Sequence, residues 1–502
     1  MALTRKSFIK WVLGSGAAMA CPFPVSGAEP GGPGGPPSAP PKLGGEQNAV
    51  CHAVRDHKLP AMPKPSKKVD VVVVGAGPSG YAAAGALRGS DYLVLEKEPV
   101  IGGNAVAETW NGLDYCTGSA WASVFSPEVD ALFKGWKLDM KPITGADAAS
   151  FEGVWIKDFW DGKADSPLIE KLPYPDSVKK GFRDWLKGLE AIDIEKEKDK
   201  LDLMPFSDFF KGAPEPLKAY WDAFGPSNWG ARTEHTSAYL GIQGARDWPK
   251  SQRYTFEGGL GIISRKVWEQ TSEEDRKRYV FGATVVSVKK KGKGAVVTFM
   301  KDGKLEAVTA KSVVMCAPKY MARRLVPGLP KEQDAAMAAM RYAPYSVLTC
   351  CFTKRVWNMG YDNWPVGSKY FTDFVQADWV TNGEKGDPDK PQILTLYAPV
   401  LEKERADLLD DEESLYRAQK AVEELAVAVP GCVDHLAEVR MFRRGHPMPM
   451  SIPGSYTKLQ PASRADFGPI YFAHSDSSGE VSDVAYGALF GIEAAKKALK
   501  HV

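Results

Sequence analysis

Three glycines and one acid have the types and spacing of a site for phosphate and ribose. Gly75, Gly77 and Gly80 fit the pattern G-x-G-x-x-G, and Glu96 follows the first of them by 21 residues. In such a loop the first glycine permits a tight turn, the second lets the backbone approach a pyrophosphate, and the third lets a helix pack on a strand. A carboxylate at this distance binds ribose hydroxyls and would repel a 2′-phosphate. The spacing therefore predicts a dinucleotide with an unphosphorylated ribose.

The elements that must hold this loop are also visible in the sequence. Residues 69–74 contain five valines in six positions, which is typical of a strand buried on both faces of a parallel sheet. An alanine-rich helix is predicted after the loop, and its N-terminal N–H groups and dipole favour a phosphate. A second strand, residues 92–95, ends directly before Glu96. Together these elements predict an α/β fold with a Rossmann-type domain.

The segment after Glu96 narrows the choice of cofactor. Five residues, the first of them Lys97, separate this acid from the pair Gly102 and Gly103, which Asn104 follows. This E-x5-G-G segment resembles that of the flavin amine oxidase superfamily, which includes monoamine and polyamine oxidases and phytoene-desaturase-like enzymes. The resemblance implies that the dinucleotide is FAD.

Two later segments resemble the same superfamily, so the resemblance runs from residue 69 to residue 495. Within residues 256–318 it implies that Val285 contacts adenine through its backbone. The resemblance of residues 470–476 implies that Asp476 lies beside the ribityl chain and the pyrophosphate. The resemblance of the closing helix, residues 483–495, implies that the backbone at its start faces the flavin. The loop and the resemblance together predict these FAD-binding residues: Gly75, Gly77, Pro78, Ser79, Gly80, Glu96, Lys97, Gly102, Gly103, Asn104, Val285, Asp476, Val484 and Ala485.

Length and composition fit two intertwined domains. A chain of 502 residues that is 44% hydrophobic can bury a large core, and a net charge of +2 does not point to nucleic acid. The aromatic-rich middle stretches carry no phosphate loop, so we assign them to packing and to an apolar substrate pocket. We expect a split FAD-binding domain and an α+β substrate domain. The FAD-binding parts are residues 66–130, 251–330 and 461–502, and the substrate parts are residues 131–250 and 331–460.

The positions that would carry the chemistry depart from the family pattern. Thr349 stands where a family lysine binds a water near flavin N5, and Lys354 lies five residues further on. Pro447 and Val484 stand where two tyrosines form a cage over the flavin in monoamine oxidases. His446 stands at the cysteine that binds flavin covalently there, and we interpret it as a base, a covalent flavin ligand or a structural turn residue. His446, Thr349 and Lys354 are the candidates, and no catalytic residue is assigned.

Three functions agree with these features. The first is an FAD-dependent oxidoreductase that oxidises an amine or amino-acid-like small molecule by hydride transfer to flavin N5. The second is a desaturase or isomerase that acts on a C–C unit of an apolar substrate. The third is a flavoprotein subunit of an electron-transfer complex, with a redox partner such as a cytochrome.

The N-terminal residues resemble an export signal. Residues 4–10, Thr-Arg-Lys-Ser-Phe-Ile-Lys, resemble the twin-arginine motif S/T-R-R-x-F-L-K, with Lys6 in place of the second arginine. Residues 11–20 are weakly apolar and too short for a stable membrane anchor. We therefore expect a signal at residues 1–28, a Pro/Gly-rich linker at residues 29–65, and a periplasmic or otherwise exported protein without a transmembrane anchor.

The cysteines and histidines do not form a recognisable metal site. The seven cysteines lack the spacing of metal ligands, and Cys51, His52 and His57 come without further ligands nearby in the sequence. We predict no bound metal.

Overall fold

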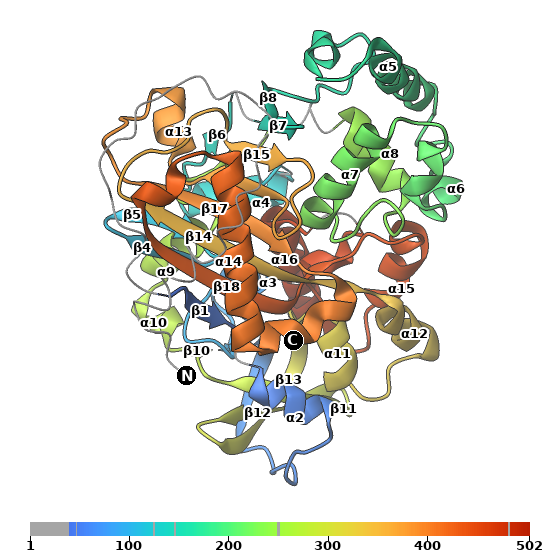
Figure 1. The fold of residues 1–502 in the computed structure, drawn as a ribbon. Coiled ribbons are helices and arrows are strands. Elements are labelled where there is room, and N and C mark those ends of the chain that lie inside the picture. Colours follow the sequence, from blue (N-terminus) through green and yellow to red (C-terminus); the bar gives the residue numbers. More distant parts are fainter. Residues whose placement is uncertain (1–39, 47, 124–125, 145–146, 248–251, 480–481) are drawn as a thin grey trace.

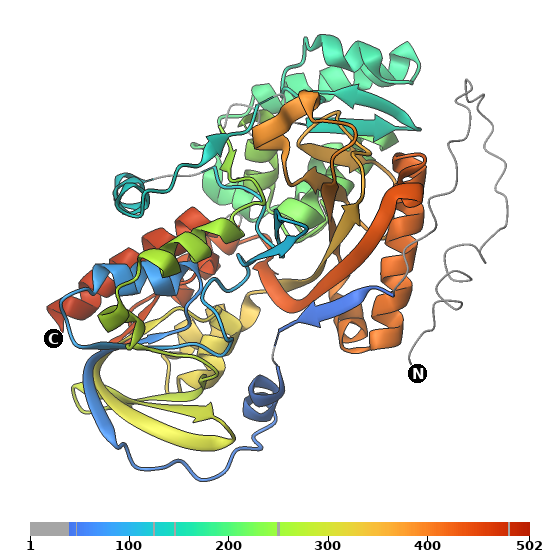
Figure 2. The ribbon, with the colours of Figure 1, turned by 90° about the vertical axis from the view of Figure 1, so that its left-hand side faces the viewer.

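The structure is a computed structural model that describes residues 40–46, 48–123, 126–144, 147–247, 252–479 and 482–502 (Figure 1). The expected export signal, residues 1–28, lies outside the described residues. Two sheets form the centre of the molecule, and the chain crosses between them several times (Figure 2).

The first sheet carries the glycine loop. Its strands follow the order β10-β3-β2-β13-β12-β11, and β19 also pairs with β13. Strands β10, β3, β2, β13 and β19 run parallel, whereas β11, β12 and β13 form an antiparallel meander. The bounds are β2 Lys67–Val74, β3 Tyr92–Leu95, β10 Tyr279–Val280, β11 Thr284–Lys291, β12 Gly294–Lys301, β13 Lys304–Met315 and β19 Ile470–Phe472.

Both faces of this sheet are covered, which explains the continuous valine run of β2. Val71 and Val73 pack in one apolar cluster with α3 and α16. Val72 and Val74 pack in another, on the side of α2, α11 and α12. The prediction of a Rossmann-type α/β fold is thereby confirmed. The covering helices are α2 Ala49–Arg55, α3 Pro78–Ala86, α4 Pro127–Gly135, α9 Gly261–Gln270, α11 Lys319–Leu325, α12 Lys331–Ala339 and α16 Val484–Lys500.

The second sheet forms the core of the other domain. Its strands follow the order β1-β18-β14-β17-β16-β15-β7-β8. Helix α14, Asp411–Ala428, packs its apolar side on β14 and β17. The bounds are β1 Lys42–Gly45, β7 Asp147–Phe151, β8 Val154–Lys157, β14 Tyr342–Phe352, β15 Asp362–Pro365, β16 Asp373–Gln376, β17 Gln392–Pro399 and β18 Leu436–Pro449.

A helical layer packs beside this sheet and holds most of the aromatic residues of the first middle stretch. Trp221 and Trp229 stack with ring centroids 5.6 Å apart, and Phe206 and Phe224 pack against them. Within the described part of the chain, none of the aromatic side chains between residues 155 and 247 lines the main cavity. These rings serve packing. The helices are α5 Asp176–Glu190, α6 Lys198–Asp202, α7 Glu215–Asn228 and α8 Ala238–Asp247.

Short elements complete the fold. The strands are β4 Ala107–Trp110, β5 Leu113–Cys116, β6 Lys141–Pro142 and β9 Tyr254–Thr255, and the helices are α10 Glu273–Arg276, α13 Trp379–Asn382 and α15 Gln460–Ser463. In the described residues, no helix combines the length and the apolar character needed to cross a membrane.

Part of the expected linker differs from the expectation, because β1 and α2 within it belong to the fold. Strand β1 pairs in parallel with β18, and the side chain of Val54 in α2 is buried in the core of the first domain. A strand needs only backbone partners, and one buried valine with its apolar neighbours is enough to anchor a short helix. Composition alone therefore gave little sign of this structure.

Candidate cofactor and active site

A cavity of about 1030 Å³ lies between the two domains. The glycine loop, the segment after β3, the start of α16, the segment 442–446 of β18, α11 and the β1–α2 segment all line it. Ten of the predicted FAD-binding residues reach this cavity, and they are Gly75, Gly77, Pro78, Ser79, Glu96, Lys97, Gly103, Asn104, Val285 and Val484. The other four do not line it, and they are Gly80, Gly102, Asp476 and Ala485.

Two glycines of the loop serve different purposes. Gly80 is needed for the fold, whereas Gly77 is needed for binding of the cofactor. A Cβ atom built on Gly80 would lie 1.9 Å from the carbonyl oxygen of Gly75, so only glycine lets α3 approach the turn this closely. A Cβ on Gly77 would meet nothing nearer than 3.7 Å, the distance to the Cα of Gly103. The fold itself therefore tolerates a side chain at residue 77, and that side chain would occupy the cavity where a pyrophosphate is expected.

Glu96 is held ready to accept ribose hydroxyls. Its Oε2 accepts a hydrogen bond from the backbone N–H of Ala76 at 2.5 Å, and its Oε1 accepts one from the N–H of Glu98 at 2.8 Å. Burial raises the pKa of Glu96, while the two N–H groups favour its charged form. The carboxylate thus has a fixed orientation at the edge of the cavity.

Two helix N-termini converge on the same cavity. Gly77 is the N-cap residue of helix α3, and α16 is capped by Asp483, whose Oδ1 accepts a hydrogen bond from Ala485 N at 2.5 Å. Gly491 lets the two helices touch, because a Cβ there would lie 2.1 Å from the oxygen of Ser79. Burial raises the pKa of Asp483 to about 6. The positive ends of both helix dipoles therefore favour an anion in this part of the cavity.

Asp476 lies beneath the cavity instead of in its wall. Its carboxylate accepts hydrogen bonds from the Nζ of Lys319 at 2.5 Å, from the backbone N of Lys319 at 2.8 Å and from the hydroxyl of Tyr342 at 2.7 Å. Both side chains of the Lys319–Asp476 pair are fully buried. The neighbours His474 and Ser475 line the cavity instead. Asp476 is thus a buried support for the neighbouring cavity wall and is not part of its lining.

The three catalytic candidates lie in different environments. His446 lines the cavity, with its ring stacked on Tyr320 at a centroid distance of 4.4 Å. Burial and the nearby Arg405 lower the pKa of His446 to about 4, so its imidazole is neutral at pH 7. Thr349 is fully buried in β14, and its hydroxyl has no hydrogen-bond partner among the described residues. Lys354 is exposed and pairs with Asp389 at 3.1 Å. Only His446 is in a position to meet a bound ligand.

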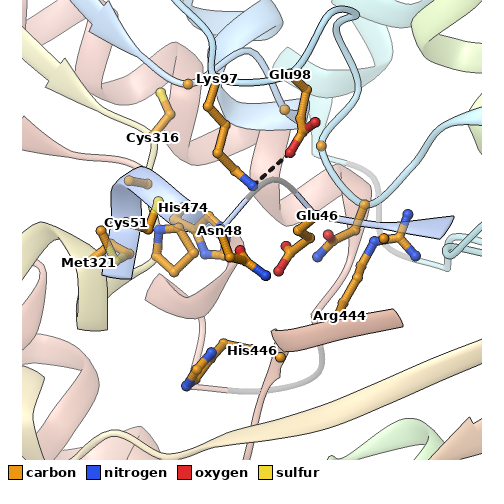
Figure 3. Close-up of a pocket in the computed structure, with 18 of the residues that line it drawn as sticks. Glu46, Asn48, Cys51, Lys97, Glu98, Cys316, Met321, Arg444, His446 and His474 are labelled. Atoms are coloured by element: carbon orange, nitrogen blue, oxygen red, sulfur yellow. Dashed lines mark hydrogen bonds and ion pairs between the residues drawn. The ribbon is translucent and has the colours of Figure 1, made fainter. Parts of the chain in front are cut away.

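Sequence analysis did not identify the part of the cavity wall that the β1–α2 segment forms. Glu46, Asn48, Cys51 and His52 line the cavity from the β1–α2 segment, and Figure 3 shows Glu46 between Lys97 and the residues of β18. The Cys51 and His52 side chains thus belong to the cavity wall. A search of the described residues finds no group of three side chains that could hold a metal ion. The only sequence signal for this wall was the apolar pattern around α2, which is too short to be distinctive.

A separate acidic cluster is buried within the second sheet. Arg253 donates to Asp147 at 2.7 Å and lies 3.9 Å from Asp362. Burial and the Asp373 carboxylate raise the pKa of Asp362, and burial raises that of Asp373. Asp362 and Asp373 are neighbouring buried carboxyls that cannot both ionise in this environment, so the pair holds a proton.

Comparison with known proteins identifies the family. The model of the family described as flavin containing amine oxidoreductase matches residues 79–499. The chain belongs to this family. It is an FAD-dependent oxidoreductase of the amine-oxidase type, and FAD is its cofactor. The cavity fits this cofactor, because the open position beside Gly77, the oriented Glu96 and the two helix N-termini face it together.

Individual proteins resemble this chain at low sequence identity. The oxidoreductase PigB of Serratia sp. (strain ATCC 39006) is 23% identical over 516 residues, which cover 85% of this chain and 74% of PigB. A putrescine oxidase bound to putrescine has a TM-score of 0.65 at 19% identity, covering 86% of this chain and 99% of its own. The cyclohexylamine oxidase of Brevibacterium oxydans IH-35A has a TM-score of 0.66 at 18% identity, with the same coverage. These two structures share the fold.

Proposed function

We propose that this flavoenzyme oxidises an amine or amino-acid-like small molecule by hydride transfer to FAD. The main support is one continuous cavity that joins the dinucleotide loop to His446 in a chain of the amine oxidoreductase family. Putrescine oxidase and cyclohexylamine oxidase, which have this fold, are named for amine substrates. When bound, FAD supplies the hydride acceptor.

The residues around the cavity have roles in binding and orientation. Glu96 and the start of α3 hold the ribose and phosphate parts of the cofactor, and the N-terminus of α16 adds a second positive dipole end. The imidazole of His446, fixed by stacking on Tyr320, is neutral at pH 7 and can accept a hydrogen bond from a substrate. Such a contact would orient the substrate without adding a charge next to Arg405.

An anaerobic titration tests this function. Primary amines, secondary amines and amino acids are added to the FAD-loaded enzyme, and the absorbance of oxidised flavin is followed. We expect at least one of these compounds to bleach the flavin within seconds. The variant Gly77→Val, which should contain no FAD, serves as the control. If amines leave the flavin oxidised while an apolar compound with an oxidisable C–C unit bleaches it, the proposed substrate class is wrong.

The composition of the cavity favours that C–C reaction as the second candidate. Val484 lines the cavity at a family cage position, and Arg324 and Arg405 lie on the same side as His446. These two cations raise the energy of a protonated amine nearby. The same titration distinguishes the two classes of substrate.

We further propose that residues 1–28 export the folded, FAD-loaded protein, which would then pass electrons to oxygen or to a redox partner such as a cytochrome. The support is the Arg5-Lys6 pair within a twin-arginine-like run. Cell fractionation of the wild type and of Arg5→Gln/Lys6→Gln tests this proposal. We expect the wild type in the periplasm and the variant, still yellow, in the cytoplasm. A wild type that stays cytoplasmic would refute export.

A further inference from the structure

The segment before β2 crosses from one domain to the other along the cavity. It consists of residues 42–46 and 48–55, and we call it the strap. Figure 2 shows its first part, β1, beside β18 of the second sheet, with the chain then running to α2 at the first domain. The strap precedes residues 79–499, to which the family model matches.

The first anchor of the strap is on the second domain. Backbone pairing joins Lys42 to Arg440 and Gly45 to Arg443 along the edge of the sheet. The Nζ of Lys42 lies 2.9 Å from the carboxylate of Glu438, and a Cβ on Gly45 would lie only 2.7 Å from the carbonyl oxygen of Arg443. A larger residue at position 45 would therefore push β1 away from β18.

The second anchor is on the first domain. Val54 is 7% exposed and belongs to the apolar cluster formed by β2, β11 and α11. Val50 and Leu59, on either side of it, pack partly buried against the same cluster. A charged residue at position 54 would detach α2 from this core, because burial of an unpaired carboxylate is costly.

Between the anchors, the strap turns polar side chains into the cavity. Glu46, Asn48, Cys51 and His52 line it. Figure 3 shows the first three of these side chains. Burial works against the charge of Lys97, but the carboxylates of Glu46 and Glu98 raise its pKa above the ordinary value. Glu46 likewise acts on Arg444 across the cavity, where it partly offsets the effect of burial. The strap thus contributes charge and hydrogen-bonding groups to the cavity that the glycine loop also lines.

We propose that the strap is part of the FAD site and closes over the bound dinucleotide, so that FAD leaves only when the strap opens. The glycine loop, Glu96 and Val285 line the same cavity as Glu46, Asn48, Cys51 and His52 of the strap, so a dinucleotide bound at the loop shares the cavity with the strap. One four-residue strand and one seven-residue helix hold the strap. So short a segment opens at a much lower free energy than the whole domain, and its opening sets the rate of FAD release.

The rate of FAD release tests the strap directly. FAD-loaded protein is mixed with an excess of an apoflavoprotein that captures free FAD, and the transfer is followed by flavin fluorescence. We expect Val54→Asp and Gly45→Val, which act at opposite anchors, each to release FAD at least fivefold faster than the wild type. The matched control is Val427→Asp, because Val427 is 81% exposed on α14 and away from the cavity. Equal release rates for the wild type and both anchor variants would refute the proposal.

A second measurement uses the wild type and does not depend on the folding of any variant. Cys51 faces the cavity from the strap, so bound FAD should shield its thiol from N-ethylmaleimide. We expect the peptide that contains Cys51 to be alkylated at least fivefold more slowly in the FAD-loaded protein than in the FAD-stripped protein. Equal rates would overturn the inference. Neither assay requires a substrate, so the outcome is independent of the proposed amine chemistry.

Discussion

Removal of the Asp476 carboxylate should lower the free energy of unfolding of the protein even when no cofactor is bound. The substitution Asp476→Leu leaves the fully buried ammonium of Lys319 with the hydroxyl of Ser477, at 2.6 Å, as its remaining hydrogen-bond partner. Breaking a buried ion pair in this way costs about 3–5 kcal/mol. The backbone N of Lys319 and the hydroxyl of Tyr342 also lose their acceptor, at roughly 1 kcal/mol or more each. We therefore expect a total loss of about 5 kcal/mol or more.

A double-mutant cycle isolates the contribution of the ion pair. Lys319→Met removes the charge that Asp476→Leu leaves unpaired, so the double variant should recover about 3 kcal/mol of the loss. The assay is urea unfolding of FAD-stripped wild type, both single variants and the double variant at pH 7. A coupling energy below about 1 kcal/mol would refute the reasoning, because it would mean that water or another group stabilises Lys319.

The pH dependence provides an independent check on the same pair. Burial opposes the charge of Asp476, but Lys319 lowers its pKa well below the ordinary 3.8. A carboxyl with a lowered folded-state pKa stabilises the protein above its unfolded pKa and loses this contribution as the pH falls. The stability difference between the wild type and Asp476→Asn should therefore be constant from pH 5 to 8 and shrink below about pH 4.

Three further predictions concern other parts of the molecule. Gly77→Val should keep the wild-type circular dichroism spectrum but lose flavin absorbance. Gly80→Ala should instead lower the melting temperature, because its Cβ would overlap the oxygen of Gly75. A Gly77→Val variant that stays yellow would contradict this prediction. His446 should show an NMR titration midpoint near its pKa of about 4. Because the unfolded chain takes up this proton more readily, the protein should lose stability as the pH drops from 6.5 to 4; a midpoint above 6 would disprove its burial. Burial raises the pKa of Asp373 to about 7, so the wild type should lose stability between pH 4 and 8. The melting temperature of Asp373→Asn relative to that of the wild type should therefore be higher at pH 8 than at pH 4. A difference that does not grow with pH would count against a proton shared by the buried carboxyls.

The residues of the cofactor site that lie close together in the sequence could be predicted, because they belong to one strand–loop–helix unit. Gly77 and Glu96 reach the cavity as expected, since a strand, a loop and a helix of fixed length determine where they lie. Val285 and Val484 also reach it, although they lie far along the chain, because each lies at the start of a recognisable element, β11 or α16.

The long-range parts could not be predicted. Asp476 pairs with Lys319 across 157 residues, and nothing in the sequence around either residue indicates its partner. Thr349 was aligned with a family lysine by position along a strand, but position does not specify whether a short side chain reaches the cavity. The strap was hidden because β1 binds through its backbone, which any sequence can provide.

The order of elements along the chain has a consequence for biosynthesis. Gly77 opens α3 near the start of the folded chain, whereas α16, which packs against α3 through Gly491, is the last helix. The site has high contact order, and such contacts form late because a long loop must close first. A ribosome that has made all but the final helix therefore exposes a glycine loop without its second wall. FAD capture that uses both helix N-termini must therefore wait until α16 has been made and has packed on α3.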